Sequence, residues 1–502
     1  MFGDKILILD FGGTQARSVA RKVRSERVFC EVLPHDAPID AIRQANAKGV
    51  ILAGGSEQGD EALRCDARVF ELGLPLLAFG YSSRLMISEM GGRTLGVLAE
   101  NRAEEISFGS SSLFDGLGDS DRYFERVDAV ELPECFEELA VSPGGLVPAF
   151  GCDEKRMYGL QFYPESNDPD GFTILANFAV NICGCAPVWS VESFVEYELA
   201  KIRKTVGDGR ALIAISGGVD SAVCAALMHR AVGENLTCLY VNTGLMRKGE
   251  TELVESVFRD QLGMELLCVD ATERFLARLR GVTDPQEKRR LIGDELLQVF
   301  ADESRKLGSF DFLVQGTIYP DVISSYSHEG IYSLDPKEVS VGDVVFERVV
   351  EPLRLLFKDE VRQVGEILGM PRELINRQPF PGPGLAIRCL GEVTQSKLEI
   401  LREADAIFRE EIADAGLDRR IWQYFAVLTD VRSAGVRGGE RRYEHAIALR
   451  AVSSQDAVSA YAYRMPYDLL ERVVQRITTE VPDVNRVVYD MTGKPTALIE
   501  WE

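Results

Sequence analysis

A turn rich in serine and glycine, with one aspartate, separates an apolar run from a helical stretch near the middle of the chain. The run Ala211–Ile215 predicts a buried strand. Adjacent glycines let successive backbone N–H groups converge at a helix N-terminus, where the helix dipole also favours an anion. The pattern predicts a phosphate loop at Ser216, Gly217, Gly218, Val219, Asp220 and Ser221. An ordinary turn between a strand and a helix is the alternative that the pattern leaves open.

The carboxylate of Asp220 is unusual in a loop that binds anions, because it would repel phosphate oxygens. A divalent cation that bridges carboxylate and phosphate removes this conflict, so Asp220 is a candidate Mg²⁺ ligand. The loop lacks the lysine and the spacing of a Walker sequence. A different type of phosphate site is therefore expected.

Ser-Gly-Gly-Val-Asp-Ser is also the loop of the ATP pyrophosphatases, which cleave ATP between its α and β phosphates. Nearly the whole chain resembles one group of them, the glutamine-hydrolysing GMP synthetases. The resemblance implies an α/β fold with a class I glutamine amidotransferase-like domain at 1–186 and a parallel-sheet ATP pyrophosphatase domain at 187–382. A small α+β dimerisation domain is implied at 383–502.

The composition fits a globular protein of several domains, with 46% hydrophobic and 27% charged residues among 502. A formal net charge of -23 repels nucleic acid and anionic lipid, so neither is an expected partner. No stretch approaches the ~18 apolar residues of a membrane span, and no signal peptide is evident. The ten cysteines are scattered without a CxxC pair, which favours reduced thiols and a cytoplasmic location over zinc or disulfides.

Three apolar runs in the first domain each lead into a turn that contains glycine, at 10–13, 53–55 and Gly80. Helical stretches are expected between them, over 14–28 and 61–72. Strand, turn and helix repeated in this way predict a parallel sheet, with ligands at the carboxyl ends of its strands.

The first domain resembles class I glutamine amidotransferases, in which an elbow cysteine and a His-Pro-Glu segment supply nucleophile, base and orienting carboxylate. Here Gly80 stands in place of the cysteine and Tyr163 in place of the histidine, and only Glu165 remains. A thioester mechanism needs a thiolate and an adjacent base. Tyrosine, with a pKa of about 10, is a poor base at neutral pH. Ser82 and Ser83 would still lack a histidine, so no glutaminase activity is expected.

Further residues are assigned to ATP by the resemblance. Asn242 follows a strand over 236–241, where the family usually has aspartate, and Gly316 lies in a Gln-Gly-Thr-Ile-Tyr-Pro-Asp segment that matches the family in full. That segment ends in Asp321, a candidate for magnesium or for positioning the nucleotide. A buried aspartate that caps a loop is the alternative.

Lys358 is implied as a pyrophosphate contact at the start of a helix, and with Asp220 and Asp321 it completes the expected catalytic set. Its alternative is a surface lysine paired with Asp359 or Glu360.

The acceptor nucleotide is assigned by the resemblance to two regions. One is a basic cluster in a helix that Asp284 is expected to cap, although a solvated helix face is the alternative for such a cluster. The other combines a Pro/Gly-rich arch over 377–385 with the C-terminal tail over 490–502. The implied contacts are Lys288, Arg289, Arg290, Pro383, Gly384, Lys494, Ile499 and Glu500.

Two segments depart from the family. A mobile segment that closes over the nucleotides in the family is rebuilt over 324–349, where only His328 corresponds to it. Gly439 stands where a substrate loop of the family has aspartate. Both departures leave the identity of the acceptor open.

The implied function is adenylation of a purine nucleotide carbonyl, XMP or a close analogue, by ATP and Mg²⁺ in a homodimer. Free ammonia then displaces AMP. One alternative keeps the adenylation but uses another modified purine nucleotide with an amine or sulfur nucleophile. Another is a non-catalytic nucleotide-binding regulator, against which the retained Asp220, Asp321 and Lys358 argue.

Overall fold

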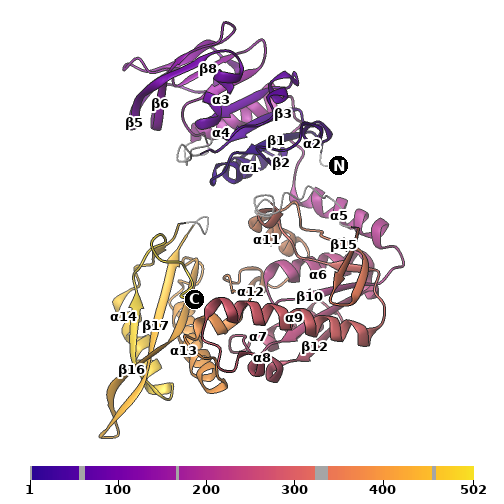
Figure 1. Cartoon of the computed structure of the whole chain (residues 1–502), viewed down its shortest axis with the longest axis vertical. Coiled ribbons are helices and arrows are strands. Elements are labelled where there is room, and N and C mark those ends of the chain that lie inside the picture. Colours follow the sequence, from indigo (N-terminus) through magenta and orange to yellow (C-terminus); the bar gives the residue numbers. More distant parts are fainter. Residues whose placement is uncertain (1–2, 56–62, 165–168, 323–336, 455–458) are drawn as a thin grey trace. The chain divides into compact units, whose positions relative to one another are not determined.

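The computed structural model describes residues 3–55, 63–164, 169–322, 337–454 and 459–502 (Figure 1). The chain divides into two compact units. The first contains Met1–Tyr197 with the short segments Ile318–Tyr332 and Leu355–Phe357, and the second contains the remaining residues. The three domains expected from the sequence are a finer division, which stays a prediction.

A nine-stranded sheet forms the centre of the first unit among the described residues, in the order β2-β1-β3-β4-β9-β8-β7-β5-β6. Neighbours are parallel from β2 to β9 and antiparallel from β9 to β6, which confirms the parallel sheet expected in this part of the chain. The strands are β1 (Lys5–Asp10), β2 (Phe29–Pro34), β3 (Gly49–Ala53), β4 (Leu76–Phe79), β5 (Arg93–Phe108), β6 (Ser120–Glu131), β7 (Glu137–Val141), β8 (Ala149–Cys152) and β9 (Met157–Leu160).

Both faces of the parallel part of this sheet are buried. Ile6 and Ile8 point to one face of β1 and Leu7 and Leu9 to the other, since strand side chains alternate, and all four are at most 1% exposed. Helices must therefore cover both faces. The isoleucine face packs with α1 (Gln15–Ser25) and α4 (Pro169–Ala176), and the leucine face with α2 (Ile39–Gln44) and α3 (Tyr81–Glu89).

The helix expected over 61–72 is wrong in its described part. Only a short 3₁₀ turn, Ala67–Glu71, forms there. The Asp66 carboxylate accepts a hydrogen bond from the Arg68 N–H at 3.0 Å and also binds the Arg68 side chain. Such local side-chain bonds offer the backbone an alternative to a regular helix.

Arg24 contacts two segments of the first unit that lie far from it in the sequence. Its guanidinium lies over the rings of Tyr319 and Phe357, 5.2 and 4.9 Å from their centroids, and donates a hydrogen bond to the Leu355 carbonyl at 2.8 Å. Arg24 is only 5% exposed, and desolvation strengthens cation–π contacts. Residues 318–322 and Leu355–Phe357 therefore belong to the first unit, and Tyr319, Val322 and Phe357 are part of its core.

The second unit contains a six-stranded sheet in the order β12-β11-β10-β13-β15-β14, parallel except for the edge strand β14. Its strands are β10 (Ala211–Ile215), β11 (Leu236–Asn242), β12 (Leu266–Asp270), β13 (Phe312–Val314), β14 (Lys337–Val341) and β15 (Val344–Val350). The associated helices are α5 (Val191–Val206), α6 (Val219–Val232), α7 (Glu250–Glu255), α8 (Thr272–Leu279), α9 (Pro285–Leu307), α11 (Lys358–Ile367) and α12 (Arg372–Ile375). The predicted strand at Ala211–Ile215 is confirmed, as is the cap of α9, where Asp284 accepts from the Glu287 N–H at 2.8 Å.

A second sheet follows, built from β16 (Gln423–Arg437), β17 (Glu440–Ser453), β18 (Tyr461–Ala462) and β19 (Val484–Asp490). Helices α13 (Gln395–Asp414) and α14 (Tyr467–Glu480) pack on it. One hydrophobic cluster runs through both sheets, from Leu239 on β11 to Leu398 on α13 and Leu449 on β17. Residues 383–502 therefore share their core with the parallel sheet.

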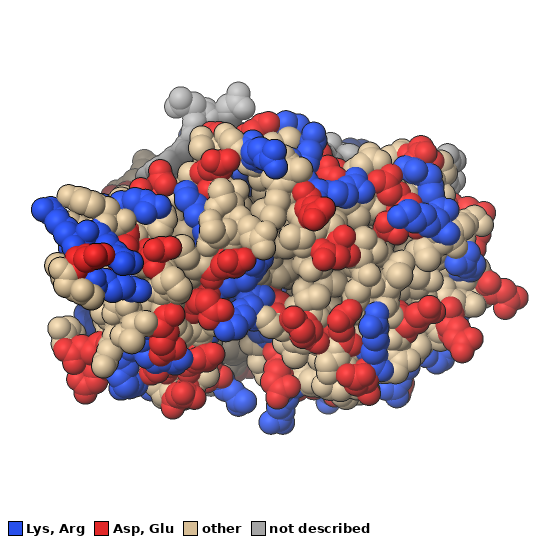
Figure 2. Space-filling view, turned by 90° about the horizontal axis from the view of Figure 1, so that it is seen from below, with Lys and Arg blue, Asp and Glu red and all other residues tan. Residues whose placement is uncertain are grey.

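Charges of both signs alternate over the face shown in Figure 2, where Lys and Arg are interspersed with Asp and Glu. No helix in the described part of the chain is long and apolar enough to cross a membrane.

Candidate active site

The phosphate loop, residues 216–221, lies at the carboxyl end of β10, with β11 and β13 on either side. Gly217 has a φ of +74°, a conformation that glycine adopts without strain, and α6 begins at Val219. The Ser221 hydroxyl accepts a hydrogen bond from the Ser216 N–H and donates one to the Gly218 carbonyl, both at 3.2 Å. The predicted turn between a strand and a helix N-terminus is therefore present, and its own serine side chains brace it.

The strands on both sides of β10 deliver predicted residues to this end of the sheet. A Cβ on Gly316, after β13, would lie 3.1 Å from the Ser221 N and 3.2 Å from the Asp220 carbonyl carbon, so glycine permits this close approach. Asn242 ends β11, and its Oδ1 accepts a hydrogen bond from the Gly244 N–H at 3.0 Å. Gly316 thus packs on the phosphate loop, and Asn242 shapes the neighbouring turn.

An ion pair joins the phosphate loop to α11. Lys358 Nζ lies 2.5 Å from Oδ2 of Asp220, and the two side chains are 36% and 28% exposed. The predicted position of Lys358 at the start of a helix is confirmed, and its partner is the loop aspartate rather than Asp359 or Glu360. A lysine beside the loop can neutralise negative charge on a bound polyphosphate.

The second oxygen of Asp220 makes the site suitable for magnesium. Oδ1 is buried and has no hydrogen-bond partner, which is costly for a carboxylate unless a ligand completes it. Mg²⁺ prefers carboxylate oxygens and usually shares its coordination between one or two protein ligands and substrate phosphates. No cluster of three metal-ligating side chains occurs in the described residues.

Asp321, the other predicted metal ligand, belongs to the first unit. Its Oδ2 accepts a hydrogen bond from the Ile318 N–H at 3.1 Å, so it caps the turn of its own segment. The capping agrees with the alternative raised from the sequence, but Asp321 is exposed rather than buried. A role of Asp321 in binding metal or nucleotide stays a prediction.

Arg377, at the start of the arch, is a site residue that sequence reasoning missed. Its guanidinium donates to the Gly217 carbonyl and to the Glu250 carboxylate, and its side chain is 10% exposed. Arg247 Nε binds the same carboxylate at 2.8 Å. Burial would raise the pKa of Glu250, but Arg247 and Arg377 outweigh it and hold that pKa below its usual value. The sequence held one signal for this role, since Arg377 is a cation at the start of the rigid Pro/Gly segment.

The arch itself packs on the turn after β11. Gly384 has a φ of +63°, and a Cβ there would lie 2.4 Å from the Leu245 carbonyl oxygen. The Leu385 N–H donates to that oxygen at 2.7 Å. Pro383 and Gly384 are therefore held against the strand end that also carries Asn242, while their contact with an acceptor nucleotide stays a prediction.

Two residues of the predicted basic cluster bind the end of the chain. Lys288 is fully buried and its Nζ donates to Glu502 Oε2 at 2.5 Å and to the Cys389 carbonyl at 2.8 Å. Arg289 donates to the Glu502 carbonyl at 2.6 Å. Two residues earlier, Glu500 forms a bidentate pair with the buried Arg388, at 2.7 and 3.0 Å. The structure therefore brings the basic helix and the C-terminal tail together.

The other predicted acceptor contacts lie in different environments. Arg290 is exposed and pairs with Glu287 and Asp294, as on a solvated helix face. Lys494 exchanges backbone hydrogen bonds with Ala460, and Ile499 is 9% exposed in a small apolar cluster. These contacts fix the tail, and nucleotide binding by its side chains stays a prediction.

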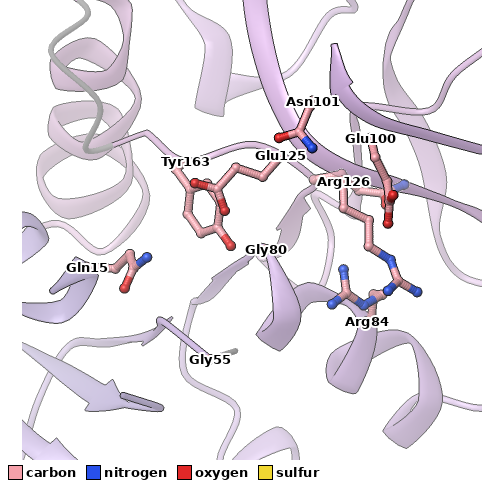
Figure 3. A pocket seen from close by; sticks show the side chains of 10 residues that line it. Gln15, Gly55, Gly80, Arg84, Glu100, Asn101, Glu125, Arg126 and Tyr163 are labelled. Carbon is pink, nitrogen blue, oxygen red and sulfur yellow. The ribbon is translucent and has the colours of Figure 1, made fainter. Parts of the chain in front are cut away.

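The elbow between β4 and α3 keeps its shape without a nucleophile (Figure 3). Gly80 has φ +58° and ψ -126°, a conformation that side chains rarely adopt. A Cβ on Gly80 would lie 2.6 Å from the Tyr163 hydroxyl and 2.7 Å from its ring carbons. Tyr163 therefore fills the space into which a side chain at this position would project. Glu165 lies outside the described residues.

No replacement nucleophile is evident near the elbow in the described part of the unit. Ser82 and Ser83 are fully buried, and their hydroxyls donate to the carbonyls of Leu52 at 2.6 Å and of Gly80 at 2.8 Å. Burial raises the pKa of the Cys65 thiol to about 11, so that thiol stays protonated at neutral pH.

Comparison with known families first defines the class of protein. Residues 7–182 match the family described as glutamine amidotransferase class-I, and residues 410–501 match the GMP synthase C terminal domain. These two matches confirm the α/β fold predicted from the sequence, with an amidotransferase domain followed by a GMP synthase C-terminal domain.

Relatives along the full length then give the family. The glutamine-hydrolyzing GMP synthase of Symbiobacterium thermophilum is 48% identical over 522 residues, and that of Caldicellulosiruptor saccharolyticus is 49% identical over 512 residues, each covering 99% of both chains. The Acetivibrio thermocellus enzyme of the same name is 48% identical over 519 residues and covers 100% of both. The chain belongs to the GMP synthase family.

Asp220→Asn tests the phosphate loop. The amide keeps the size of the side chain but removes the charge that binds Lys358 and would bind magnesium. We expect the rate of ATP-dependent pyrophosphate release to fall about 10²–10³-fold, the range typical for loss of one preorganised electrostatic group. The matched control is Asp208→Asn, an exposed carboxylate just before β10. An unchanged rate in Asp220→Asn would contradict the assignment.

Lys288→Met tests the anchoring of the tail. It leaves the Glu502 carboxylate, 9% exposed, without its buried partner. We expect the second unit to lose about 3–5 kcal/mol of unfolding free energy in urea, as for other broken buried pairs.

Adding Glu502→Gln should restore part of that loss, because no unpaired charge then remains. The control Arg290→Met, in the same helix, should leave the unfolding midpoint unchanged. Equal midpoints for Lys288→Met and the wild type would exclude the proposed anchor.

Gly80→Ala tests the fit of Tyr163 against the elbow. We expect a loss of about 1–3 kcal/mol from overpacking, measured by thermal unfolding of the first unit. Gly116→Ala is the control for backbone strain alone, since its φ is +85° and a Cβ there meets no atom within 4 Å. In a Tyr163→Ala background the two alanine substitutions should cost the same, and a persisting difference would show that Tyr163 is not the obstacle.

Proposed function

We propose that the chain is an ATP-dependent synthetase that adenylates the carbonyl of XMP or a close purine analogue and aminates it with free ammonia. Pyrophosphate, AMP and GMP are the products. The first unit contributes no glutaminase activity in this proposal. A homodimer with ATP and Mg²⁺ bound in the second unit is the expected form.

The adenylating half of the proposal is supported by the phosphate loop and by the relatives. Relatives at 48–49% identity over full length carry the name GMP synthase. In this chain the loop is paired with Lys358, and the free oxygen of Asp220 is available for a metal ion. A non-catalytic nucleotide-binding protein would have no use for a lysine paired with a carboxylate that keeps one oxygen unsatisfied.

The reaction needs positioning and charge neutralisation rather than a side-chain nucleophile. The acceptor oxygen attacks the α phosphorus of ATP, and the bond to pyrophosphate breaks. Ammonia then adds to the activated carbon, AMP leaves with the original oxygen, and the nitrogen loses a proton. Held geometry alone can contribute about 7–11 kcal/mol to such a step. Mg²⁺, when bound at Asp220, would neutralise phosphate charge, and Lys358 would stabilise the departing pyrophosphate.

We propose ammonia rather than glutamine as the nitrogen source because of the close approach of Tyr163 to Gly80. A thioester requires a thiolate at the elbow, and Gly80 provides no atom to form it. The ring of Tyr163 lies where the Cβ of a nucleophile would stand, and its phenol is a poor base at neutral pH. The glutamine hydrolysis for which the relatives are named is therefore not proposed for this chain.

A second candidate keeps the adenylation but changes the acceptor, to another modified purine nucleotide that reacts with an amine or sulfur nucleophile. Gly439 favours it. With Gly438 it forms the two-residue turn of the β16–β17 hairpin, and both have positive φ, +62° and +83°. The position therefore presents no acidic side chain. Of the rebuilt segment 324–349, residues 324–336 lie outside the described residues. The remainder, from residue 337, forms β14 and most of β15.

One assay tests the proposal. The protein is incubated with ATP, Mg²⁺ and XMP, with either ammonium or glutamine, and GMP and pyrophosphate are measured. We expect GMP with ammonium and none with glutamine. GMP formed from glutamine would overturn the nitrogen source. Pyrophosphate formed without GMP from either source would favour the second candidate, and no pyrophosphate with a range of purine nucleotides would overturn the synthetase itself.

A further inference from the structure

A chain of contacts leads from the phosphate loop to the C-terminal tail within the second unit. It begins at Arg377, whose guanidinium donates to the Gly217 carbonyl and to the Glu250 carboxylate. A peptide unit is planar, so holding this carbonyl also fixes the direction of the Gly218 N–H, which donates to the Ser216 hydroxyl at 3.2 Å. Arg377 therefore sets the orientation of one peptide in the loop that is expected to bind the polyphosphate of ATP.

The next contacts are made by two buried arginines and one aromatic ring. Arg247 binds Glu250 through its Nε at 2.8 Å, and its guanidinium lies over the ring of Phe380, 4.6 Å from the centroid. Arg388 lies over the same ring at 5.3 Å and forms the bidentate pair with Glu500. Burial strengthens such contacts between a cation and a ring. Phe380 therefore contacts one cation of the phosphate-loop network and another that holds the tail.

The backbone of the arch connects the same two sites. Gln423 Nε2 donates to the Pro379 carbonyl at 3.2 Å and to Glu500 Oε1 at 3.1 Å. The prolines within residues 379–383 restrict φ, so a displacement at Arg377 is transmitted along the arch rather than absorbed by it. One stiff segment therefore contacts the phosphate loop at its first residue and the side chains that hold the tail a few residues later.

We propose that Arg377 and Phe380 are positioning residues that couple ATP at the phosphate loop to the order of the tail, where the acceptor nucleotide is expected to bind. ATP on the loop fixes the Gly217 peptide and with it Arg377, and the contacts through Phe380 then restrain Arg388 and the tail. A tail that is already ordered loses less conformational entropy when the acceptor arrives, so the two nucleotides bind cooperatively. This inference rests on the ATP binding of the proposed function but on no particular acceptor.

Hydrogen–deuterium exchange of the full chain tests the coupling, with Mg²⁺ and an ATP analogue whose α and β phosphates are joined by a methylene group. No acceptor is added, so the result does not depend on its identity. Peptides from 216–232 report binding of the analogue, and peptides from 490–502 report the order of the tail. We expect the analogue to slow exchange in both, by about fivefold or more in the tail, which is the lower end of typical coupling between two sites.

Phe380→Leu removes the ring but keeps an apolar side chain against the core. The analogue should still protect 216–232, while the protection that it adds to 490–502 falls to about twofold or less. Phe380→Tyr, which keeps the ring, should restore that protection. Arg377→Lys should lose it, because an ammonium group lacks the planar fork that binds a carbonyl and a carboxylate together. Each variant is compared with and without the analogue, so a general loss of stability does not imitate a loss of coupling.

The matched control is Phe310→Leu. Phe310 belongs to the same core and makes the same type of contact, with the Arg210 guanidinium 4.4 Å from its ring centroid, but it lies outside this network. Its tail should be protected as in the wild type. Full protection of the tail in Phe380→Leu, its loss in Phe310→Leu, or a wild type protected at 216–232 but not at 490–502 would each overturn the coupling alone. No protection of 216–232 in the wild type would overturn the ATP binding of the proposed function, and this inference with it.

Discussion

The ion pair between Lys358 and Asp220 is the contact on which the second unit depends. It joins a loop at the centre of a parallel sheet to a helix more than a hundred residues later in the chain. It satisfies only one oxygen of the aspartate, and the other is buried without a partner. A folded protein tolerates such an unsatisfied oxygen where a ligand completes it, and a metal ion shared with a polyphosphate would complete this one.

Residues from other segments of the second unit also contact this loop. Gly316 allows the neighbouring strand to approach it, and Arg377 binds both its carbonyl at Gly217 and the buried Glu250. Through Arg377 the arch and the phosphate loop share one hydrogen-bond network. The tail is held in the same unit by Lys288 and Arg388, which bind Glu502 and Glu500. The loop over 216–221, the arch and the C-terminal tail therefore belong to one unit, whose core extends through both sheets.

The first unit keeps the elbow of the class-I glutamine amidotransferase family with a glycine, Gly80, at its tip. The strained turn at Gly80 is kept, although the reason for strain in such an elbow is to expose a nucleophile. Tyr163 packs against the vacant position and the T-shaped contact of its ring with Phe79, at 6.2 Å, anchors it. What remains is a polar cavity lined by arginine and glutamate side chains (Figure 3). Its polar character comes from side chains of α3, β5 and β6 rather than from the elbow.

The sequence alone was sufficient for the elements whose signals are local. The apolar run Ala211–Ile215 is a strand because a parallel sheet covered on both faces buries side chains that point either way. Asp284 caps α9 because its carboxylate accepts a hydrogen bond from a backbone N–H of the first turn, which has no partner within the helix. It also predicts, through the resemblance, that Gly80 and Tyr163 stand in place of the reacting groups, since residue types decide which bonds can form. The helix expected over 61–72 does not form in its described part because the Asp66 carboxylate accepts a hydrogen bond from the Arg68 backbone N–H, a competition that hydrophobic spacing does not reveal.

Only the tertiary structure decided which charges meet. Lys288, Arg289 and Arg290 are adjacent in the chain, yet the first two bind Glu502 while the third lies in solvent, because successive residues of a helix point in different directions. The pairing of Lys358 with Asp220, and of Arg84 with Asp128, likewise joins residues from separate elements. Ion pairs depend on distance in space, which the order of residues in a chain does not specify.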